Sequence, residues 1–571
     1  MKHRIRRFPA LWRASRLMRR WYHARVNAYP DWRPLVDSNC EMWTSARMAA
    51  QGGPRVLMAT TIGSYAHGIA LESALAAALT FRGAEVHALL CDGAMTACAE
   101  CDASLYPNIA TFATQGPSRD LCRDCCWPAE RVYRQLGLKV HRYSEWLTAE
   151  DRGEAKRLAS TVAFGDIVSF TLDGIAIGEH ANAGALRFFA SGSLDEERHG
   201  EAVLRRYFEA ALLTAFATRR LMRGVGFTSA VFTHGIYVPW GIVGAVARQE
   251  GVHVSTWNVA YRKRRFIFSH DDTYHHTLMH EPLEHWQDLP LAAAQERELL
   301  QYLSSRRDGV FDWIVFHRPN QHTPADIARR LGLDTSKPVI GLLTSVTWDA
   351  QLHYPANAFP NMLEWLVQTC EYFARRPDLQ LLIRVHPAEI SGFPRSRQPI
   401  LGELRKRLPS LPPNVIVVPP DSGMSTYSLM SLCNAAIIYS TKTGVELTSV
   451  GIPVIVAGEA WIRNKGITHD ASSPAEYFRI LEQLPFTDRL EPSQLARARR
   501  YAYHFFFNRM IPLPFIEPKA GYPIYRLKLD TLEQLLPGQS DGLDTICSGI
   551  LSRRPFVLRP AHMESPQLVT S

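Results

Sequence analysis

The feature that most constrains the fold is a repeated order of strand, glycine-containing loop, helix and strand. An apolar run at residues 55–60 is followed by a loop at 62–68, an Ala- and Leu-rich helix and a second apolar run at 85–91. This order is typical of a βαβ unit and implies a parallel sheet. The same unit recurs at residues 230–257, so the first half of the chain is predicted to form one α/β domain.

A second series of such units begins near residue 337. Its expected strands are 339–343, 379–385, 415–418, 435–439 and 453–456. We therefore predict an α/β fold with two Rossmann-like, doubly wound domains facing a cleft. Ligands of such sheets bind beyond the carboxyl ends of the strands, so the loops at those ends are the places to search for a site.

The expected division has four parts. Residues 1–50 form a basic arm, and 51–330 form an N-terminal domain that carries a Cys-rich insertion at 91–126. Residues 331–515 form a C-terminal domain, and 516–571 form an extension and tail. The last ~30 residues lose periodicity, and we expect them to fray.

The net charge of +9 is concentrated in the arm. Residues 1–33 hold ten Lys or Arg and one acid, and without them 54 basic and 54 acidic residues remain. A nucleic-acid enzyme more often spreads basic charge along a domain face, so no nucleic-acid partner is expected.

The arm is also amphipathic when it is plotted as a helix. Apolar side chains that include Phe8 and Trp12 share one arc, and arginines occupy the opposite side. This pattern indicates a segment that lies in an anionic membrane interface. The alternative is a surface helix packed on its own domain. We find no apolar run long enough to span a bilayer and no secretory signal, so we expect a cytoplasmic protein held at the inner face of the membrane.

Two motifs follow predicted strands in the second series. The pair His386-Pro387 comes after the strand at 379–385, and residues 440–446 (STKTGVE) come after the strand at 435–439 and open a helix. Hydroxyls and backbone N–H groups at such a position suit a phosphate, and Glu446 suits ribose hydroxyls. The alternative is a turn with ordinary helix caps and a solvated glutamate.

Together these motifs resemble the nucleotide-sugar half of GT-B glycosyltransferases, most closely the bacterial capsule polysaccharide family that includes transferases of 3-deoxy-manno-octulosonic acid (Kdo). The resemblance implies a CMP-, UDP- or GDP-linked sugar donor and catalysis without a metal ion. Its motif residues would bind the donor: His386 and Pro387 at the phosphate or nucleotide, Ser440, Thr441, Thr443 and Gly444 at the phosphate, and Glu446 at the ribose.

The first domain offers candidates for the base that takes the acceptor's hydroxyl proton. His67 lies at a predicted helix start, where some inverting GT-B enzymes keep a histidine. Asp271 and Asp272 belong to a polar run, and His234 follows a predicted strand. We rank His67 first, the two aspartates second and His234 third.

Six of the ten cysteines lie between residues 91 and 126. Two Cys-x2-Cys pairs separated by 20 residues fit a structural zinc site; they are Cys98, Cys101, Cys122 and Cys125. An iron–sulfur cluster and unligated thiols remain alternatives.

The sequence thus predicts a glycosyltransferase of bacterial surface polysaccharide synthesis, acting on a glycan or lipid-linked acceptor. The alternatives are a nucleotide-sugar epimerase of the same two-domain build and a non-catalytic scaffold of an assembly complex.

Overall fold

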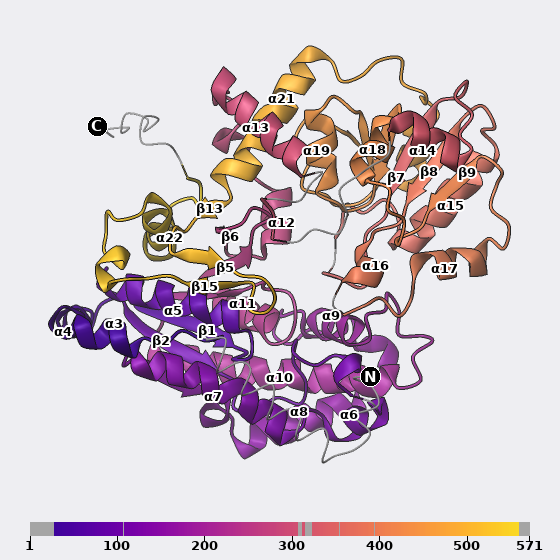
Figure 1. The fold of residues 1–571 in the computed structure, drawn as a ribbon. Helices are drawn as coiled ribbons and strands as arrows, with labels where there is room; N and C mark the ends of the chain where they lie inside the picture. The colour runs from indigo at the N-terminus through magenta and orange to yellow at the C-terminus, as the bar shows by residue number, and fades with distance from the viewer. Residues whose placement is uncertain are drawn as a thin grey trace, which may run out of the picture. The chain divides into compact units, whose positions relative to one another are not determined.

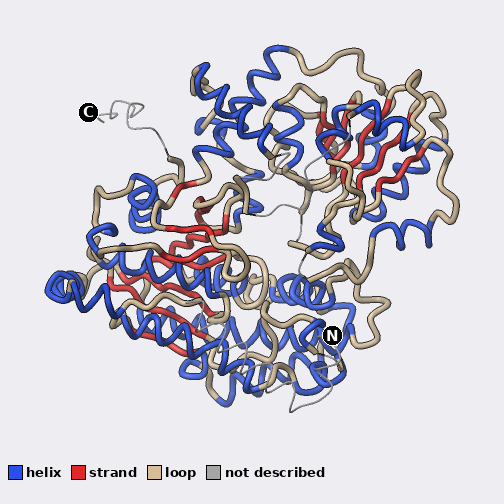
Figure 2. Tube along the Cα trace, in the orientation of Figure 1, coloured by secondary structure: helices blue, strands red, loops and turns tan. Residues whose placement is uncertain are grey.

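The computed structural model describes residues 28–106, 108–306, 311–313, 323–352, 354–392 and 394–558. These residues form two compact units, each built on its own sheet (Figure 1). Within the described ranges, unit 1 comprises residues 28–188, 194–274 and 507–558, and unit 2 comprises 189–193 and 275–506. Figure 2 shows the strands of each unit gathered together with helices around them. Two Rossmann-like α/β domains are therefore confirmed.

Unit 1 contains a seven-stranded sheet in the order β13-β6-β5-β4-β1-β2-β3. Strands β1 to β5 are parallel, β6 pairs antiparallel with β5, and β13 pairs antiparallel with β6 at the edge. Six of the seven residues of β1 are buried, because a parallel sheet is covered on both faces. The bounds are β1 Arg55–Thr61, β2 Glu85–Leu90, β3 Lys139–Arg142, β4 Ser229–Thr233, β5 His253–Val259, β6 Arg265–His270 and β13 Ile511–Pro512.

The helices of unit 1 cover this sheet. Helices α5 and α7 contact each other and strands β1 to β3, whereas α10 packs against α11, which contacts β4 and β5. A separate hairpin joins β14 (Ile516–Pro518) and β15 (Tyr525–Leu527). The helices are α3 Arg33–Ser38, α4 Cys40–Ala49, α5 Ala66–Thr80, α6 Ile109–Gln115, α7 Arg119–Gln135, α8 Ala149–Thr161, α9 Ile177–Phe189, α10 Gly200–Val225, α11 Trp240–Gln249 and α22 Asp541–Ser552.

Unit 2 contains a six-stranded parallel sheet in the order β12-β11-β10-β7-β8-β9. The chain starts at β7, adds β8 and β9 on one side, and then continues with β10 on the other side of β7. The point where the strand order reverses therefore lies between β7 and β10. The strands are β7 Val339–Leu343, β8 Gln380–Arg384, β9 Val415–Val418, β10 Ala435–Ile438, β11 Val454–Val456 and β12 His469–Asp470.

Ten helices accompany this sheet in the described part of unit 2. They are α12 Tyr274–Met279, α13 Ala293–Ser305, α14 Pro324–Leu331, α15 Met362–Ala374, α16 Ala388–Ser391, α17 Ile400–Arg407, α18 Thr426–Ser431, α19 Thr443–Ser449, α20 Pro474–Leu481 and α21 Pro492–Tyr503. A cluster of buried apolar side chains surrounds α15 and includes Trp365 and Phe373, both fully buried.

The domain boundaries differ from the expected ones. The chain enters unit 2 at residue 275 instead of 331, because α13 packs against α21 of that unit. Residues 507–558 return to unit 1, where β13 pairs with β6 and α22 packs against α5. The expected frayed tail therefore contains a helix, whose buried face consists of Gly542, Leu543, Ile546, Cys547, Gly549 and Ile550.

The N-terminal arm is described from residue 28 onward. Residues 1–27, where the amphipathic helix is predicted, lie outside the described residues. In the segment that follows, Trp32 is fully buried and the Tyr29 hydroxyl donates a hydrogen bond to the Gly63 carbonyl. None of the helices in the described ranges combines the length and apolarity needed to cross a membrane.

Candidate functional site

The reversal of strand order in unit 2 places the end of β7 beside the end of β10. Thr344 and Ser345 follow β7, and Ser440 follows β10 after Tyr439. The Ser345 hydroxyl donates a hydrogen bond to the Ser440 carbonyl at 3.3 Å, which joins the two strand ends. In doubly wound sheets this position is where ligands bind.

His386 is fixed at the same edge, after β8. Its backbone N–H donates to Thr344 Oγ1 at 3.0 Å, and its Nδ1 accepts from the backbone N–H of Ala388 at 3.0 Å. Because Nδ1 accepts, Nε2 carries the proton of the neutral ring. Burial, together with the charges of Lys442 and Arg384, lowers the pKa of His386 to about 4. At neutral pH this side chain is an uncharged N–H donor.

Residues 440–446 follow β10, which lies on the other side of β7 from β8. The hydroxyls of Thr441 and Thr443 are 3.2 Å apart, and Ser440 is exposed. A Cβ atom at Gly444 would approach Ile438 to 2.7 Å and Ile462 to 3.0 Å, so glycine allows α19 to pack closely against β10. These contacts place several hydroxyls at the edge of the sheet where a phosphate is expected.

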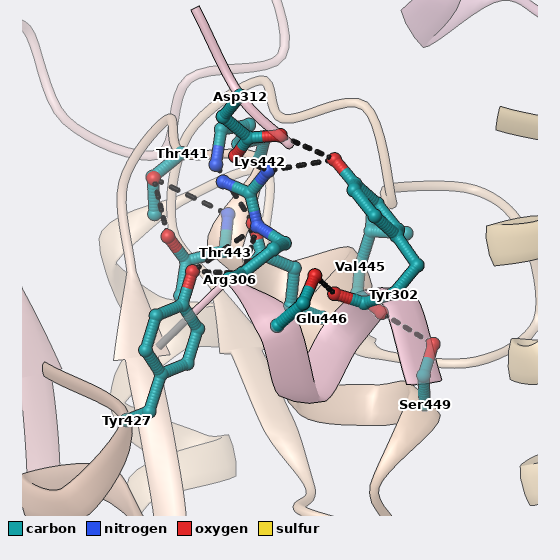
Figure 3. A network of polar contacts seen from close by, with 11 residues as sticks. Tyr302, Arg306, Asp312, Tyr427, Thr441, Lys442, Thr443, Val445, Glu446 and Ser449 are labelled. Atoms are coloured by element: carbon teal, nitrogen blue, oxygen red, sulfur yellow. Dashed lines mark hydrogen bonds and ion pairs between the residues drawn. The ribbon is translucent and has the colours of Figure 1, made fainter. Parts of the chain in front are cut away.

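Glu446 occupies the centre of a buried polar network (Figure 3). Its Oε1 accepts from Lys442 Nζ at 2.7 Å, and its Oε2 accepts from Arg306 Nε at 3.1 Å and from the Tyr427 hydroxyl at 2.5 Å. Burial raises the pKa of Glu446, but the charges of Arg306 and Lys442 outweigh it and lower the pKa to about 2. Glu446 is therefore a carboxylate, and protein donors engage both of its oxygens.

The network extends into the segment before β7. Arg306 also pairs with Asp312, and the Tyr302 hydroxyl donates to Asp312 at 2.9 Å. Two cations and two carboxylates thus balance in this network, and Lys442 is its partly exposed member. The Lys442–Glu446 pair was detectable from its i, i+4 spacing. Arg306 lies 140 residues from Glu446, and no local pattern pointed to it.

In unit 1, His67 lies in the first turn of α5. It is 8% exposed, and burial lowers its pKa to about 3. Its ring centroid is 4.0 Å from that of Tyr65, 5.4 Å from Tyr525 and 5.7 Å from Tyr522. Its Nδ1 has no hydrogen-bond partner among the described residues. A buried neutral imidazole at this position is compatible with the predicted role of proton acceptor.

His234 follows β4, the strand that pairs with β1. Its φ angle is +69°, a left-handed conformation that is uncommon outside glycine. Its carbonyl accepts from the Thr273 hydroxyl at 2.8 Å, and its backbone N–H donates to the Trp257 carbonyl at 2.9 Å. The structure therefore places His67 and His234 after neighbouring strands, at one edge of the sheet.

The two aspartates are arranged differently. Asp271 Oδ1 accepts from the backbone N–H of Val254 at 3.3 Å, near the start of β5. Asp272 Oδ1 accepts from the backbone N–H of Thr273 at 2.7 Å. Because β6 runs antiparallel, the Asp271 carboxylate lies toward the amino end of β5, whereas His67 lies beyond the carboxyl end of β1.

A buried carboxyl that the sequence analysis did not select lies on α5. Glu72 accepts hydrogen bonds from the Thr60 hydroxyl at 2.6 Å and the Trp257 indole at 2.9 Å. Burial raises its pKa to about 7, against the effect of these donors. The signal was present in the sequence, since Glu72 interrupts an otherwise apolar helix.

The cysteines lie on two elements of unit 1. Cys98 Sγ and Cys101 Sγ are 3.9 Å apart in a loop, whereas Cys122 and Cys125 belong to α7. Cys125 Sγ accepts from the backbone N–H of Ser64 at 3.3 Å. Within the described ranges, no three His, Cys, Asp or Glu side chains are grouped closely enough to hold a metal ion. The four-cysteine zinc site remains a prediction.

We expect purified protein to contain about one zinc ion per chain if these thiolates ligate a metal. Two thiolates on one tetrahedral zinc are about 3.8 Å apart, given zinc–sulfur bonds of about 2.3 Å. The Cys98–Cys101 separation of 3.9 Å fits this value. Elemental analysis is the measurement, and a Cys98→Ser/Cys101→Ser variant should lose the metal. The matched control is Cys370→Ser, which removes a buried cysteine of unit 2. Metal-free, fully active protein would contradict the prediction.

Comparisons with known proteins give low similarity. No protein-family model matches the chain, and no curated protein matches it. Two solved structures of Thermosulfurimonas dismutans KpsC, described as beta Kdo 2,4 transferase and beta Kdo 2,7 transferase, are 14% and 13% identical to it. The matches cover 48% and 56% of this chain and 80% and 88% of those chains, with TM-scores of 0.32 and 0.29.

A Methanocaldococcus jannaschii UDP-GlcNAc 2-epimerase, solved with UDP-GlcNAc and UDP, is 10% identical. That match covers 78% of this chain and 98% of the other, with a TM-score of 0.27. At such TM-scores the similarities assign neither a family nor an activity to this chain.

Proposed function

We propose that the chain is a GT-B-type glycosyltransferase whose nucleotide-sugar donor binds to unit 2. The proposal rests on the positions of His386 and residues 440–446, which follow the strands on either side of β7, where the strand order of the unit 2 sheet reverses. The His386 backbone N–H donates to Thr344, and the Ser345 hydroxyl donates to the Ser440 carbonyl. A neutral N–H donor and clustered hydroxyls at such a point suit a phosphate group.

The proposed chemistry is transfer of the sugar to an acceptor hydroxyl. His386 Nε2–H and the hydroxyls of Thr441 and Thr443 stabilise the charge that develops on the departing phosphate. Lys442 adds a cation, which Glu446 holds in place. In an inverting reaction, a base of unit 1 takes the acceptor proton, with His67 preferred. No metal ion is required for these steps.

The proposed setting is bacterial surface polysaccharide synthesis, with a glycan or lipid-linked acceptor. The enzyme acts at the cytoplasmic face of the membrane, to which residues 1–33 attach it. Support for this setting comes from the sequence motifs and from the basic arm.

Nucleotide binding tests the donor assignment. We expect His386→Ala to weaken binding of the preferred nucleotide among CMP, UDP and GDP by about tenfold or more, because a hydrogen bond to a charged phosphate is lost. Thermal shift and calorimetric titration measure the change. His280→Ala is the matched control, since His280 is an exposed histidine of the same unit. Equal affinities in the two variants would remove His386 from the donor site.

The reaction type needs a second measurement. A transferase releases free nucleotide from the sugar donor when an acceptor is present, whereas an epimerase isomerises the donor without any acceptor. A scaffold does neither, and no nucleotide raises its melting temperature. The release assay on the full chain therefore separates the three functions.

Membrane attachment has its own test. We expect deletion of residues 2–27 to abolish sedimentation with phosphatidylglycerol vesicles, because this segment holds nine Lys or Arg and no acid. Each basic residue near an anionic surface contributes about 1 kcal/mol. The deletion stops before Tyr29 and Trp32, which contact unit 1. The proposal would be contradicted if the full-length protein did not sediment with these vesicles at low salt.

A further inference from the structure

Arg306 belongs to the buried network around Glu446, although it lies far from the motif residues in the sequence (Figure 3). Its Nε donates to Glu446 Oε2 at 3.1 Å and to the Tyr427 hydroxyl at 3.2 Å. Its Nη1 donates to the Tyr302 hydroxyl at 2.8 Å and to Asp312. Arg306 directly follows α13 and is buried. Contacts on both sides of the guanidinium therefore fix its orientation.

These contacts determine what the Glu446 carboxylate can bind. Its Oε2 accepts from Arg306 and from the Tyr427 hydroxyl, and its Oε1 accepts from Lys442 Nζ. A ribose hydroxyl would have to displace one of these three donors. Displacing Arg306 or Lys442 would leave a cation of the network without its carboxylate partner, which is costly in a buried site.

Lys442 connects this network to the proposed phosphate site. Its side chain is 18% exposed, whereas those of Arg306 and Glu446 are 7% and 3% exposed. Lys442 is therefore the member of the ion-paired chain Arg306–Glu446–Lys442 that a ligand reaches most easily. Burial and the charge of Lys442 both lower the pKa of His386, so the ammonium group lies within electrostatic reach of that imidazole.

The four charges of the network sum to zero, because Arg306 and Lys442 are balanced by Glu446 and Asp312. Burial and the charge of Arg306 lower the pKa of Lys442, whereas the charges of Glu446 and Asp312 oppose this change. Without Arg306 the network would carry a net charge of −1 beside the proposed phosphate. Without the charge of Asp312 it would carry +1.

We propose that Arg306 is a positioning residue of the donor site. Together with Tyr427 it occupies Glu446 Oε2, so Oε1 is left to hold Lys442 and Glu446 takes no part in ribose recognition. Arg306 also offsets Asp312, whose charge would otherwise repel the donor phosphate. This inference rests on the proposed function and makes phosphate charge, and not the ribose hydroxyls, the feature that this network recognises.

Three variants of the full chain test the effect of charge. Arg306→Met sets the network charge to −1, Asp312→Asn sets it to +1, and the double variant restores zero. We expect Arg306→Met to weaken binding of the preferred nucleotide among CMP, UDP and GDP by about tenfold or more. Asp312→Asn should strengthen it by about three- to tenfold, because charges in a partly buried site are weakly screened. The double variant should bind within about threefold of the unmodified chain in calorimetric titration.

The order of these affinities separates positioning from a structural role. If Arg306 only stabilised the fold, Asp312→Asn would weaken binding and the double variant would bind worst, because each change removes buried hydrogen bonds. Asp312→Asn preserves the shape of its side chain, so it still decides the sign if Arg306→Met does not fold. Arg329→Met is the matched control: Arg329 pairs with Asp326 on the surface of the same unit, with its side chain 79% exposed. It should leave binding unchanged.

Matched ribonucleotides and 2′-deoxyribonucleotides test the role of Glu446. We expect the preferred nucleotide and its 2′-deoxy form to bind the unmodified chain within about threefold of each other. A hydrogen bond from the ribose 2′-hydroxyl to the Glu446 carboxylate would instead favour the ribonucleotide by about tenfold or more.

Three results would overturn the inference: Asp312→Asn weakens binding, the double variant does not recover it, or the ribonucleotide is preferred by tenfold or more. If no nucleotide raises the melting temperature of the unmodified chain, the donor assignment in unit 2 is wrong and this inference is wrong with it. If nucleotide binds and His386→Ala weakens it while the charge series fails, only the role of Arg306 is rejected.

Discussion

Glu446→Ala is expected to destabilise unit 2 by about 3–5 kcal/mol, the typical cost of removing one partner from a buried ion pair. The carboxylate is 3% exposed and accepts from Lys442 and Arg306, so its removal leaves the buried Arg306 and the partly buried Lys442 with less compensation. Urea unfolding monitored by tryptophan fluorescence measures the loss. Donor binding should weaken as well, because Lys442 loses the contact that positions its ammonium group.

An exposed ion pair of the same unit provides the control. Lys406 and Glu403 are 3.0 Å apart, and the lysine side chain is 50% exposed. We expect Lys406→Ala to change stability by less than about 1 kcal/mol, since water screens such pairs. A similarly small effect for Glu446→Ala would show that the ion pairs of Glu446 contribute little to the stability of unit 2.

His67→Ala is expected to lower turnover by about 10²–10⁴-fold, the range for loss of a general base, with donor affinity retained. The buried imidazole is neutral at physiological pH, because burial lowers its pKa to about 3. A base must be deprotonated to act, so protonation of His67 removes activity as pH falls toward 3. The rate should therefore lack the decline near pH 6.5 that an ordinary histidine produces.

The competing candidates serve as parallel variants. His234→Ala tests the histidine after β4, and Asp271→Asn and Asp272→Asn test the two aspartates. A large loss of turnover in one of these variants, with near-normal turnover in His67→Ala, would move the role of the base to that residue.

The sequence alone was sufficient for the α/β class and for the central strands of both sheets, whereas β3, β6, β12 and β13 were not predicted. Runs such as residues 339–343 are apolar throughout because both faces of a parallel sheet are covered, and the structure has strand β7 at the same residues. Local order also placed His386 and residues 440–446 directly after strands. Parallel strands end at a common edge, so both motifs were expected at that edge, but the strand order that puts β7 between β8 and β10 was decided by the tertiary structure.

The environment of each site residue was decided by tertiary structure. Glu446 was predicted to bind ribose hydroxyls, with a solvated glutamate as the alternative, yet Arg306 and Tyr427 reach it from other elements. Tyr522, which contacts Ser64 and Ala66, lies more than 450 residues from both. Local patterns report which face of an element is apolar, but contacts between distant segments depend on how those faces pack. Burial, pKa and hydrogen-bond partners all arise from that packing, so they became defined only in the folded chain.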